Sequence, residues 1–96
     1  MATINVVDVS YHQGTINWEK VKAAGYHAII RCGYGDDLTS QDDTQWKRNA
    51  NECTRLGIPF GVYIYSYAKT TAQAESEARH VLRLVKGYKT FISGIL

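Results

Sequence analysis

Asp8 is the residue best placed to do chemistry. It is a carboxylate within an otherwise apolar run, INVVDV, at residues 4–9. Enzymes built on parallel sheets keep their catalytic residues at the carboxyl ends of the strands, so we predict a catalytic role for Asp8. The alternative is structural, because an Asp at a strand end can also accept hydrogen bonds from the following loop, at Ser10 or Tyr11.

Arg31 lies in a second apolar run, YHAIIRCG, at residues 26–33. A guanidinium is costly to bury in a strand unless it meets a carboxylate or lines a polar cavity. We therefore expect Arg31 to contact substrate, with Asp8 on the neighbouring strand as its partner.

Tyr63 and Tyr65 alternate along a third run, IPFGVYIY, at residues 58–65. Side chains two apart in a strand share one face of the sheet, so these rings point the same way. Aromatic rings at the end of a sheet suit stacking on the apolar faces of sugars, which makes both tyrosines substrate-binding candidates. The alternative is that they are simply good strand formers.

Other chemistry is poorly supported. The acidic residues after the second run lack the spacing of a calcium loop, so we expect them to be solvated or to cap a helix, and we expect no metal. The loop SYHQG has one glycine and cannot cradle a phosphate, so no cofactor is expected. Two cysteines without CxxC spacing indicate packing residues. The residues concerned are Asp36, Asp37, Asp42, Asp43, Cys32 and Cys53.

The elements that would position these residues alternate between strands and helices. Strands are predicted at residues 4–9, 26–33, 58–65 and 90–96, and helices at 18–24, 44–56 and 70–86. Helix starts are indicated by Asn17, Asp43 and the pair Thr70 and Gln73. Glycines spaced roughly 30 residues apart, Gly25, Gly57 and Gly87, would end the helices.

This order predicts an α/β fold with parallel strands. The 96 residues allow one domain, residues 1–96, whereas a complete eight-stranded barrel needs about 250. We therefore expect a partial (β/α) barrel of three βα units and a fourth strand, with a small doubly wound sheet as the alternative. A net charge of +2, spread along the chain, disfavours nucleic acid. No membrane span or signal peptide is predicted, so we expect cytoplasmic synthesis.

Two segments resemble a known family. DVSYHQGTINWEKVKAAGYHAIIRCGYG and GIPFGVYIYSYAKTTAQAESEA are similar to the family 25 glycoside hydrolases, the lysozymes of bacterial autolysins and phage endolysins. The resemblance implies a bacterial or phage (β/α)-barrel enzyme that acts at the cell wall. Such an enzyme cleaves the β-1,4 bond between N-acetylmuramic acid and N-acetylglucosamine in peptidoglycan. The resemblance maps the family's first-strand Asp onto Asp8, and the family's third-strand aromatic and polar residues onto Tyr63 and Tyr65.

The chain departs from the family pattern at two places. Ile64 stands where members usually carry His, and residues 90–96, TFISGIL, lack the Asp-x-Glu pair that includes the general acid. Since glycoside hydrolysis generally needs two carboxyl groups, we expect an N-terminal portion of such a lysozyme that is inactive by itself. Whether it is an enzyme at all is left open.

Two further interpretations stay open: a non-catalytic protein that binds peptidoglycan or self-assembles as a half barrel, and an unrelated small α/β domain. The predicted sheet would leave an apolar surface and unpaired edges uncovered. We therefore expect a homodimer or a larger homo-oligomer. The apolar residues at this end are Phe91, Ile92, Ile95 and Leu96.

Overall fold

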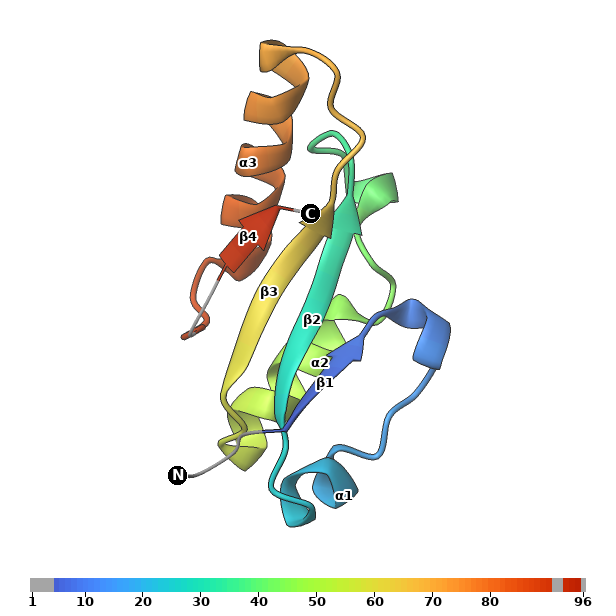
Figure 1. The fold of residues 1–96 in the computed structure, drawn as a ribbon, viewed down its shortest axis with the longest axis vertical. Coiled ribbons are helices and arrows are strands. Elements are labelled where there is room, and N and C mark those ends of the chain that lie inside the picture. The colour runs from blue at the N-terminus through green and yellow to red at the C-terminus, as the bar shows by residue number, and fades with distance from the viewer. Residues whose placement is uncertain (1–4, 91–92, 96) are drawn as a thin grey trace.

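The computed structural model describes residues 5–90 and 93–95. Within these residues, parallel strands form one sheet in which neighbours along the chain are neighbours in space (Figure 1). The strands are β1 (Val6–Val9), β2 (His27–Tyr34), β3 (Phe60–Tyr65) and β4 (Ser93–Ile95). The expected α/β class with parallel strands is confirmed.

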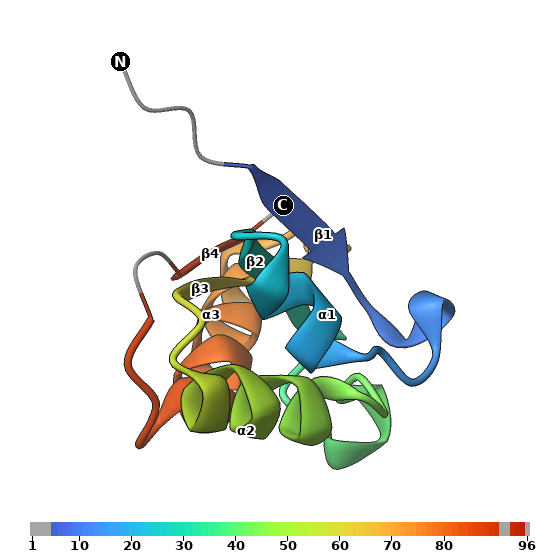
Figure 2. The same ribbon diagram turned by 90° about the horizontal axis from the view of Figure 1, so that it is seen from below.

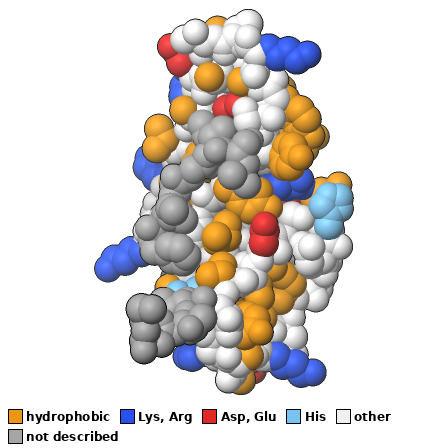
Figure 3. Space-filling model, in the orientation of Figure 1, with side chains coloured by type: hydrophobic (Ala, Val, Ile, Leu, Met, Phe, Trp, Pro, Cys, Tyr) orange, Lys and Arg blue, Asp and Glu red, His pale blue; other side chains and the backbone are white. Residues whose placement is uncertain are grey.

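The helices between these strands all lie on one side of the sheet (Figure 2). They are α1 (Trp18–Ala23), α2 (Trp46–Leu56) and α3 (Thr71–Val85), with 3-10 turns at Tyr11–Gln13 and Thr39–Gln41. No helix of the described residues covers the opposite side of the sheet, and hydrophobic side chains on this open face lie around an acidic one (Figure 3). In the described part of the chain, no helix has the length and apolarity that a membrane crossing requires.

The hydrophobic core fills the space between the sheet and the helices. Alternate residues of β2 and β3 point into it, so Ile30, Val62 and Ile64 are almost completely buried. Trp18 of α1 and Trp46 of α2 cover them from the helical side. The residues between these positions, Tyr63 among them, therefore face the open side.

Several helix ends lie where their predicted capping residues indicated. Asn17 accepts a hydrogen bond from the Lys20 amide at 3.2 Å, and Gly57 takes the left-handed conformation after α2. Thr70 accepts from the Gln73 amide at 3.1 Å, while the Gln73 side chain accepts from the amide of Lys69.

The expected helix over 44–56 instead begins at Trp46. Asp43 accepts a hydrogen bond from the Gln45 amide at 2.9 Å, so it stabilises the turn before α2 rather than capping the helix.

The fourth expected strand, residues 90–96, is described over Ser93–Ile95, where it runs beside β3. Phe91, Ile92 and Leu96, on which part of the expected apolar end rests, lie outside the described residues, as does Ile4 of the first expected strand.

Asp43 joins three segments at the carboxyl end of the sheet. Its Oδ2 accepts from the Tyr11 amide at 2.9 Å and from Arg31 Nε at 3.1 Å, and its Oδ1 accepts from the Gln45 amide. The side chain of Asp43 is completely buried. The loop after β1, strand β2 and the start of α2 are therefore held together by one carboxylate.

Asp42 anchors the same loop to α3. Its carboxylate contacts His80 Nε2 at 2.7 Å and Arg83 Nη2 at 2.7 Å. Partial burial acts to raise the pKa of Asp42, but the hydrogen bonds from Arg83 and His80 outweigh it and lower that pKa. The expectation that the acidic residues are solvated or cap a helix is therefore wrong for Asp42 and Asp43.

We predict that Asp43→Asn lowers the free energy of unfolding by about 3 kcal/mol, because it leaves the buried Arg31 without its counter-charge. Urea unfolding of the purified protein measures the change. The matched control is Asp36→Asn, an exposed position without a side-chain partner among the described residues, which should shift the value by about 0.5 kcal/mol or less. Equal effects of the two substitutions would contradict the role given to Asp43.

Candidate active site

Asp8 and Tyr63 meet on the open face of the sheet. Asp8 pairs with Ile29 of β2, and Ile29 pairs with Gly61 of β3, so Asp8 is two strands away from Tyr63. The Tyr63 hydroxyl spans this distance and donates to Asp8 Oδ1 at 2.9 Å. Asp8 itself is exposed, so its second oxygen is open to solvent and to a bound molecule.

The structural alternative for Asp8 is wrong. The Ser10 amide donates to Gln13 Oε1 at 2.6 Å, and the Tyr11 amide donates to Asp43. Both loop donors that Asp8 could have served are therefore occupied by other acceptors. Among the described residues, the one hydrogen bond of the Asp8 side chain comes from Tyr63.

The environment of Tyr63 keeps its hydroxyl protonated. Burial of the ring, followed by the hydrogen bond and the negative charge of Asp8, raises the pKa of Tyr63 to about 12. The phenol therefore stays protonated even in alkaline solution, and its hydrogen bond orients the Asp8 carboxylate.

Arg31 does not pair with Asp8 as the sequence suggested. It lies two residues beyond Ile29, the register partner of Asp8, and its Nε binds the buried Asp43 instead. The Tyr11 ring covers the guanidinium, with its centroid 4.9 Å from Cζ. Arg31 nevertheless lines a small pocket of about 180 Å³ with Tyr11 and Tyr34, although only 11% of its side chain is exposed.

Tyr65 shares the face of Tyr63, as the alternation predicted, but it is half exposed. Its ring lies 5.5 Å from that of Tyr67, which in turn meets Tyr34 edge-on at 6.2 Å. These three exposed rings form a cluster at the ends of β2 and β3. Sequence reasoning missed Tyr34 and Tyr67, although the spacing of tyrosines in YIYSYA continues beyond the strand and could have indicated Tyr67.

Glu77 is a second residue that sequence reasoning missed. It is 1% exposed on α3, and its carboxylate accepts from Ser66 Oγ at 2.6 Å and from the Tyr67 amide at 2.8 Å. It therefore holds the β3–α3 loop against the helix. An acidic residue in an amphipathic helix is usually exposed, so nothing in the local pattern signals its burial.

The cysteine thiols and the possible metal ligands do not form a reactive site among the described residues. Burial raises the pKa of the Cys32 and Cys53 thiols to about 12 in each case, so neither is a nucleophile at neutral pH. Within residues 5–90 and 93–95, no three side chains of the His, Cys, Asp and Glu types are grouped to hold a metal ion.

The arrangement supplies one oriented carboxylate on an open, aromatic face. Such a carboxylate can stabilise a developing positive charge or orient water. On the described strands, Asp8 is the only acidic residue that faces this side. A reaction that needs two carboxyl groups thus requires a second one from elsewhere.

Comparison with known proteins gives this geometry a context. The profile of the glycosyl hydrolases family 25 matches residues 7–94. The modular autolysin LytC of Streptococcus pneumoniae is 36% identical, with a TM-score of 0.76 over 91% of this chain and 20% of its own. No curated protein matched the sequence.

Two further solved structures share the fold at 23% identity. The catalytic domain of endolysin ply40, from bacteriophage P40 of Listeria monocytogenes, matches with a TM-score of 0.85 over 98% of this chain and 47% of its own. A family 25 glycosyl hydrolase from Bacillus anthracis matches with a TM-score of 0.83 over 97% of this chain and 42% of its own.

The chain spans less than half the length of each of these three solved chains, and its strands and helices match part of a family 25 barrel. The profile match over nearly all of its residues, together with the likeness to LytC, shows that the chain belongs to glycosyl hydrolase family 25.

Proposed function

We propose that this chain forms the first part of a lysozyme barrel that acts on peptidoglycan at the bacterial cell wall, with Asp8 as a catalytic carboxylate. The observation that carries the proposal is the contact between Asp8 and Tyr63, which holds an exposed carboxylate on the open face of a parallel sheet. The structure of LytC with a synthetic peptidoglycan ligand supports the choice of substrate.

The substrate-binding residues in this proposal are Arg31, Tyr63 and Tyr65. Tyr63 and Tyr65 offer aromatic surface to the apolar faces of sugar rings. Arg31 offers its terminal N–H groups to polar substituents of the glycan, while Asp43 balances its charge. The proposed reaction is hydrolysis of the β-1,4 bond between N-acetylmuramic acid and N-acetylglucosamine.

In this reaction Asp8 stabilises the positive charge that develops on the sugar ring. The transition state of glycoside hydrolysis resembles an oxocarbenium ion, and a second carboxyl group must protonate the leaving oxygen. Three other acids near the sheet are not free to stabilise this charge, because each already accepts hydrogen bonds from the protein. They are Asp42, Asp43 and Glu77.

A second candidate function is glycan binding without catalysis. It is favoured by the observation that Asp8 is the only acidic residue on the open face of the described strands. Such a protein would hold peptidoglycan on the same tyrosines without breaking it. Binding and hydrolysis measurements on the same 96-residue chain separate the two functions.

Binding should map to the open face. In NMR titration with peptidoglycan fragments, we predict the largest shifts at Asp8, Tyr63 and Tyr65. Tyr63→Phe should weaken binding about three- to tenfold, because it removes one hydrogen bond and frees Asp8 from its orienting donor. The matched control is Tyr88→Phe, which removes a hydroxyl bound to Asn51 on the helical side and should leave binding unchanged. Shifts confined to the helices would contradict the placement of the site.

Hydrolysis by the 96-residue chain alone should be no more than a trace. Losing the general acid typically costs a factor of about 10²–10⁴, and the described open face offers Asp8 alone. A turbidity assay on purified cell walls measures the rate, with a complete family 25 lysozyme as the positive control. Rapid lysis that disappears in Asp8→Asn would show that another carboxyl group of this chain acts as the acid.

The open face also motivates a proposal about assembly. Parallel sheets occur almost only with both faces covered, yet Val6 on this face is 45% exposed. Two copies of a four-stranded sheet supply the eight strands of a closed barrel, so we predict a homodimer or a larger homo-oligomer. Light scattering should give at least twice the 10.8 kDa mass, and Val6→Lys should dissociate it, whereas Leu82→Lys on the outer face of α3 should not. A stable wild-type monomer at micromolar concentration would refute the assembly.

A further inference from the structure

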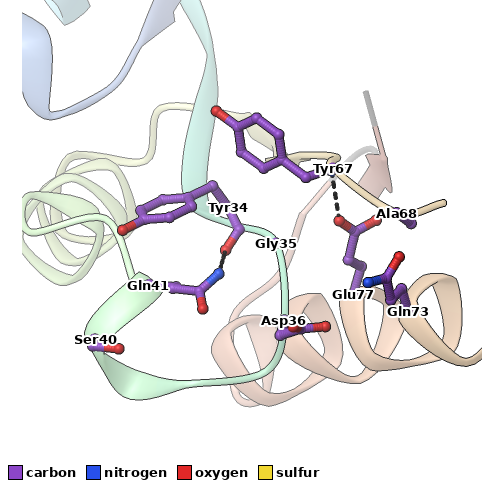
Figure 4. A pocket seen from close by; sticks show the side chains of 9 residues that line it. All are labelled: Tyr34, Gly35, Asp36, Ser40, Gln41, Tyr67, Ala68, Gln73 and Glu77. Atoms are coloured by element: carbon purple, nitrogen blue, oxygen red, sulfur yellow. Dashed lines mark hydrogen bonds between the residues drawn. The ribbon is translucent and has the colours of Figure 1, made fainter.

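A separate pocket lies beside the open face, between the loop that follows β2 and the loop that follows β3 (Figure 4). Its volume is about 450 Å³. Tyr34 and Tyr67 form one wall, with rings in edge-to-face contact at 6.2 Å and exposed fractions of 37% and 63%. Both rings therefore have surface available to a ligand, Tyr67 more than Tyr34.

The polar part of this pocket is acidic. Asp36 and Glu77 line it, and its lining includes no Lys, Arg or His, although the chain as a whole carries a net charge of +2. Neither carboxylate forms an ion pair with another described residue. The neighbouring acids Asp37 and Asp42 differ in this respect, because Arg83 neutralises both.

The Glu77 carboxylate is buried without a positively charged partner among the described residues. Its side chain is almost completely buried, and a buried carboxylate is costly unless a positive charge or good hydrogen bonds compensate it. Ser66 and the Tyr67 amide supply two hydrogen bonds but no positive charge. A cationic ligand in the pocket would supply the missing charge.

Gln41 adds a third acceptor. Its Nε2 donates to the Tyr34 carbonyl at 2.8 Å, so the amide is oriented and its Oε1 is left to accept (Figure 4). The exposed Asp36 carboxylate, the Gln41 amide oxygen and two tyrosine rings match a primary ammonium, which has three N–H donors and is attracted to aromatic faces; the buried Glu77 adds negative charge beside them. They do not match an anion, which both carboxylates would repel.

We propose that this pocket binds a primary ammonium group. Resting on the proposed function, we assign the ammonium to the side-chain amine of a diamino acid in the peptide part of peptidoglycan. The contact between Tyr65 and Tyr67 connects the pocket with the open face. A glycan on Asp8 and Tyr63 would then lie next to the pocket that receives its peptide.

The test compares two muropeptides that differ in one group, a free lysine side chain or the same side chain N-acetylated. Calorimetric titration of the 96-residue protein at low salt should show about three- to tenfold weaker binding of the acetylated fragment, because acetylation removes the charge. Asp36→Asn and Tyr67→Leu should each reduce this preference. Tyr67→Phe keeps the ring, and Glu75→Gln removes an exposed charge outside the pocket lining, so both should retain it.

Glycan strands without peptides separate the proposed ammonium pocket from the proposed glycan site at Asp8 on the open face. Their binding should weaken in Asp8→Asn and stay unchanged in Asp36→Asn. Equal binding of the two muropeptides, with glycan binding intact, would overturn the ammonium pocket alone, as would a preference that survives both Asp36→Asn and Tyr67→Leu. A preserved amine preference without any glycan binding would overturn the proposed function and the assignment to peptidoglycan.

Discussion

The arrangement of the strand ends depends on the buried ion pair between Arg31 and Asp43. A guanidinium in the middle of a sheet is tolerated only where a carboxylate and further hydrogen bonds compensate its desolvation. Asp43 meets this requirement and uses its other lone pairs on the amides of Tyr11 and Gln45. One charge therefore sets the path of the loop after β1, the position of β2 and the start of α2. Because Asp43 satisfies Arg31, Asp8 has no cationic partner among the described residues and stays available on the open face.

The open face results from the topology rather than from any one residue. Each helix returns the chain to the same side of the sheet, so alternate strand residues point either into the core or toward the side that has no helix (Figure 2). Asp8, Tyr63 and Tyr65 point toward that open side, and the Tyr63 hydroxyl reaches across β2 to Asp8. A buried Asp8 carboxylate would need a positively charged partner. The exposed Asp8 carboxylate can be oriented by the neutral Tyr63 hydroxyl, and its negative charge stays available to a ligand.

The features that the sequence predicted correctly are those that depend on residues close together in the chain, such as the helix ends. Asn17 and Gly57 mark helix ends by hydrogen bonds and conformations that span only a few residues. The partner of Arg31 could not be predicted in this way. The strand register places Asp8 opposite Ile29, and Asp43 reaches Arg31 because the loop after β2 folds back onto that strand; neither is visible in the local pattern. Glu77 was missed for a related reason: its hydrogen-bond donors lie about a helix length away in the sequence, and its burial depends on how the β3–α3 loop packs.

The segments that carry the family resemblance contain both scaffold and site. In DVSYHQG, Ser10 and Gln13 hydrogen-bond each other and shape the turn, whereas Asp8 makes no contact with that turn's amides. In YIYSYA, Ser66 binds Glu77, whereas Tyr63 faces Asp8. A match to the motif therefore indicates the fold and the site together, and it does not separate them. Physical contacts do separate them: scaffold residues satisfy buried donors and acceptors of the protein, while one oxygen of the exposed Asp8 carboxylate has no partner among the described residues. An oxygen that only solvent contacts, rather than the motif around it, is what a carboxylate needs in order to bind a ligand.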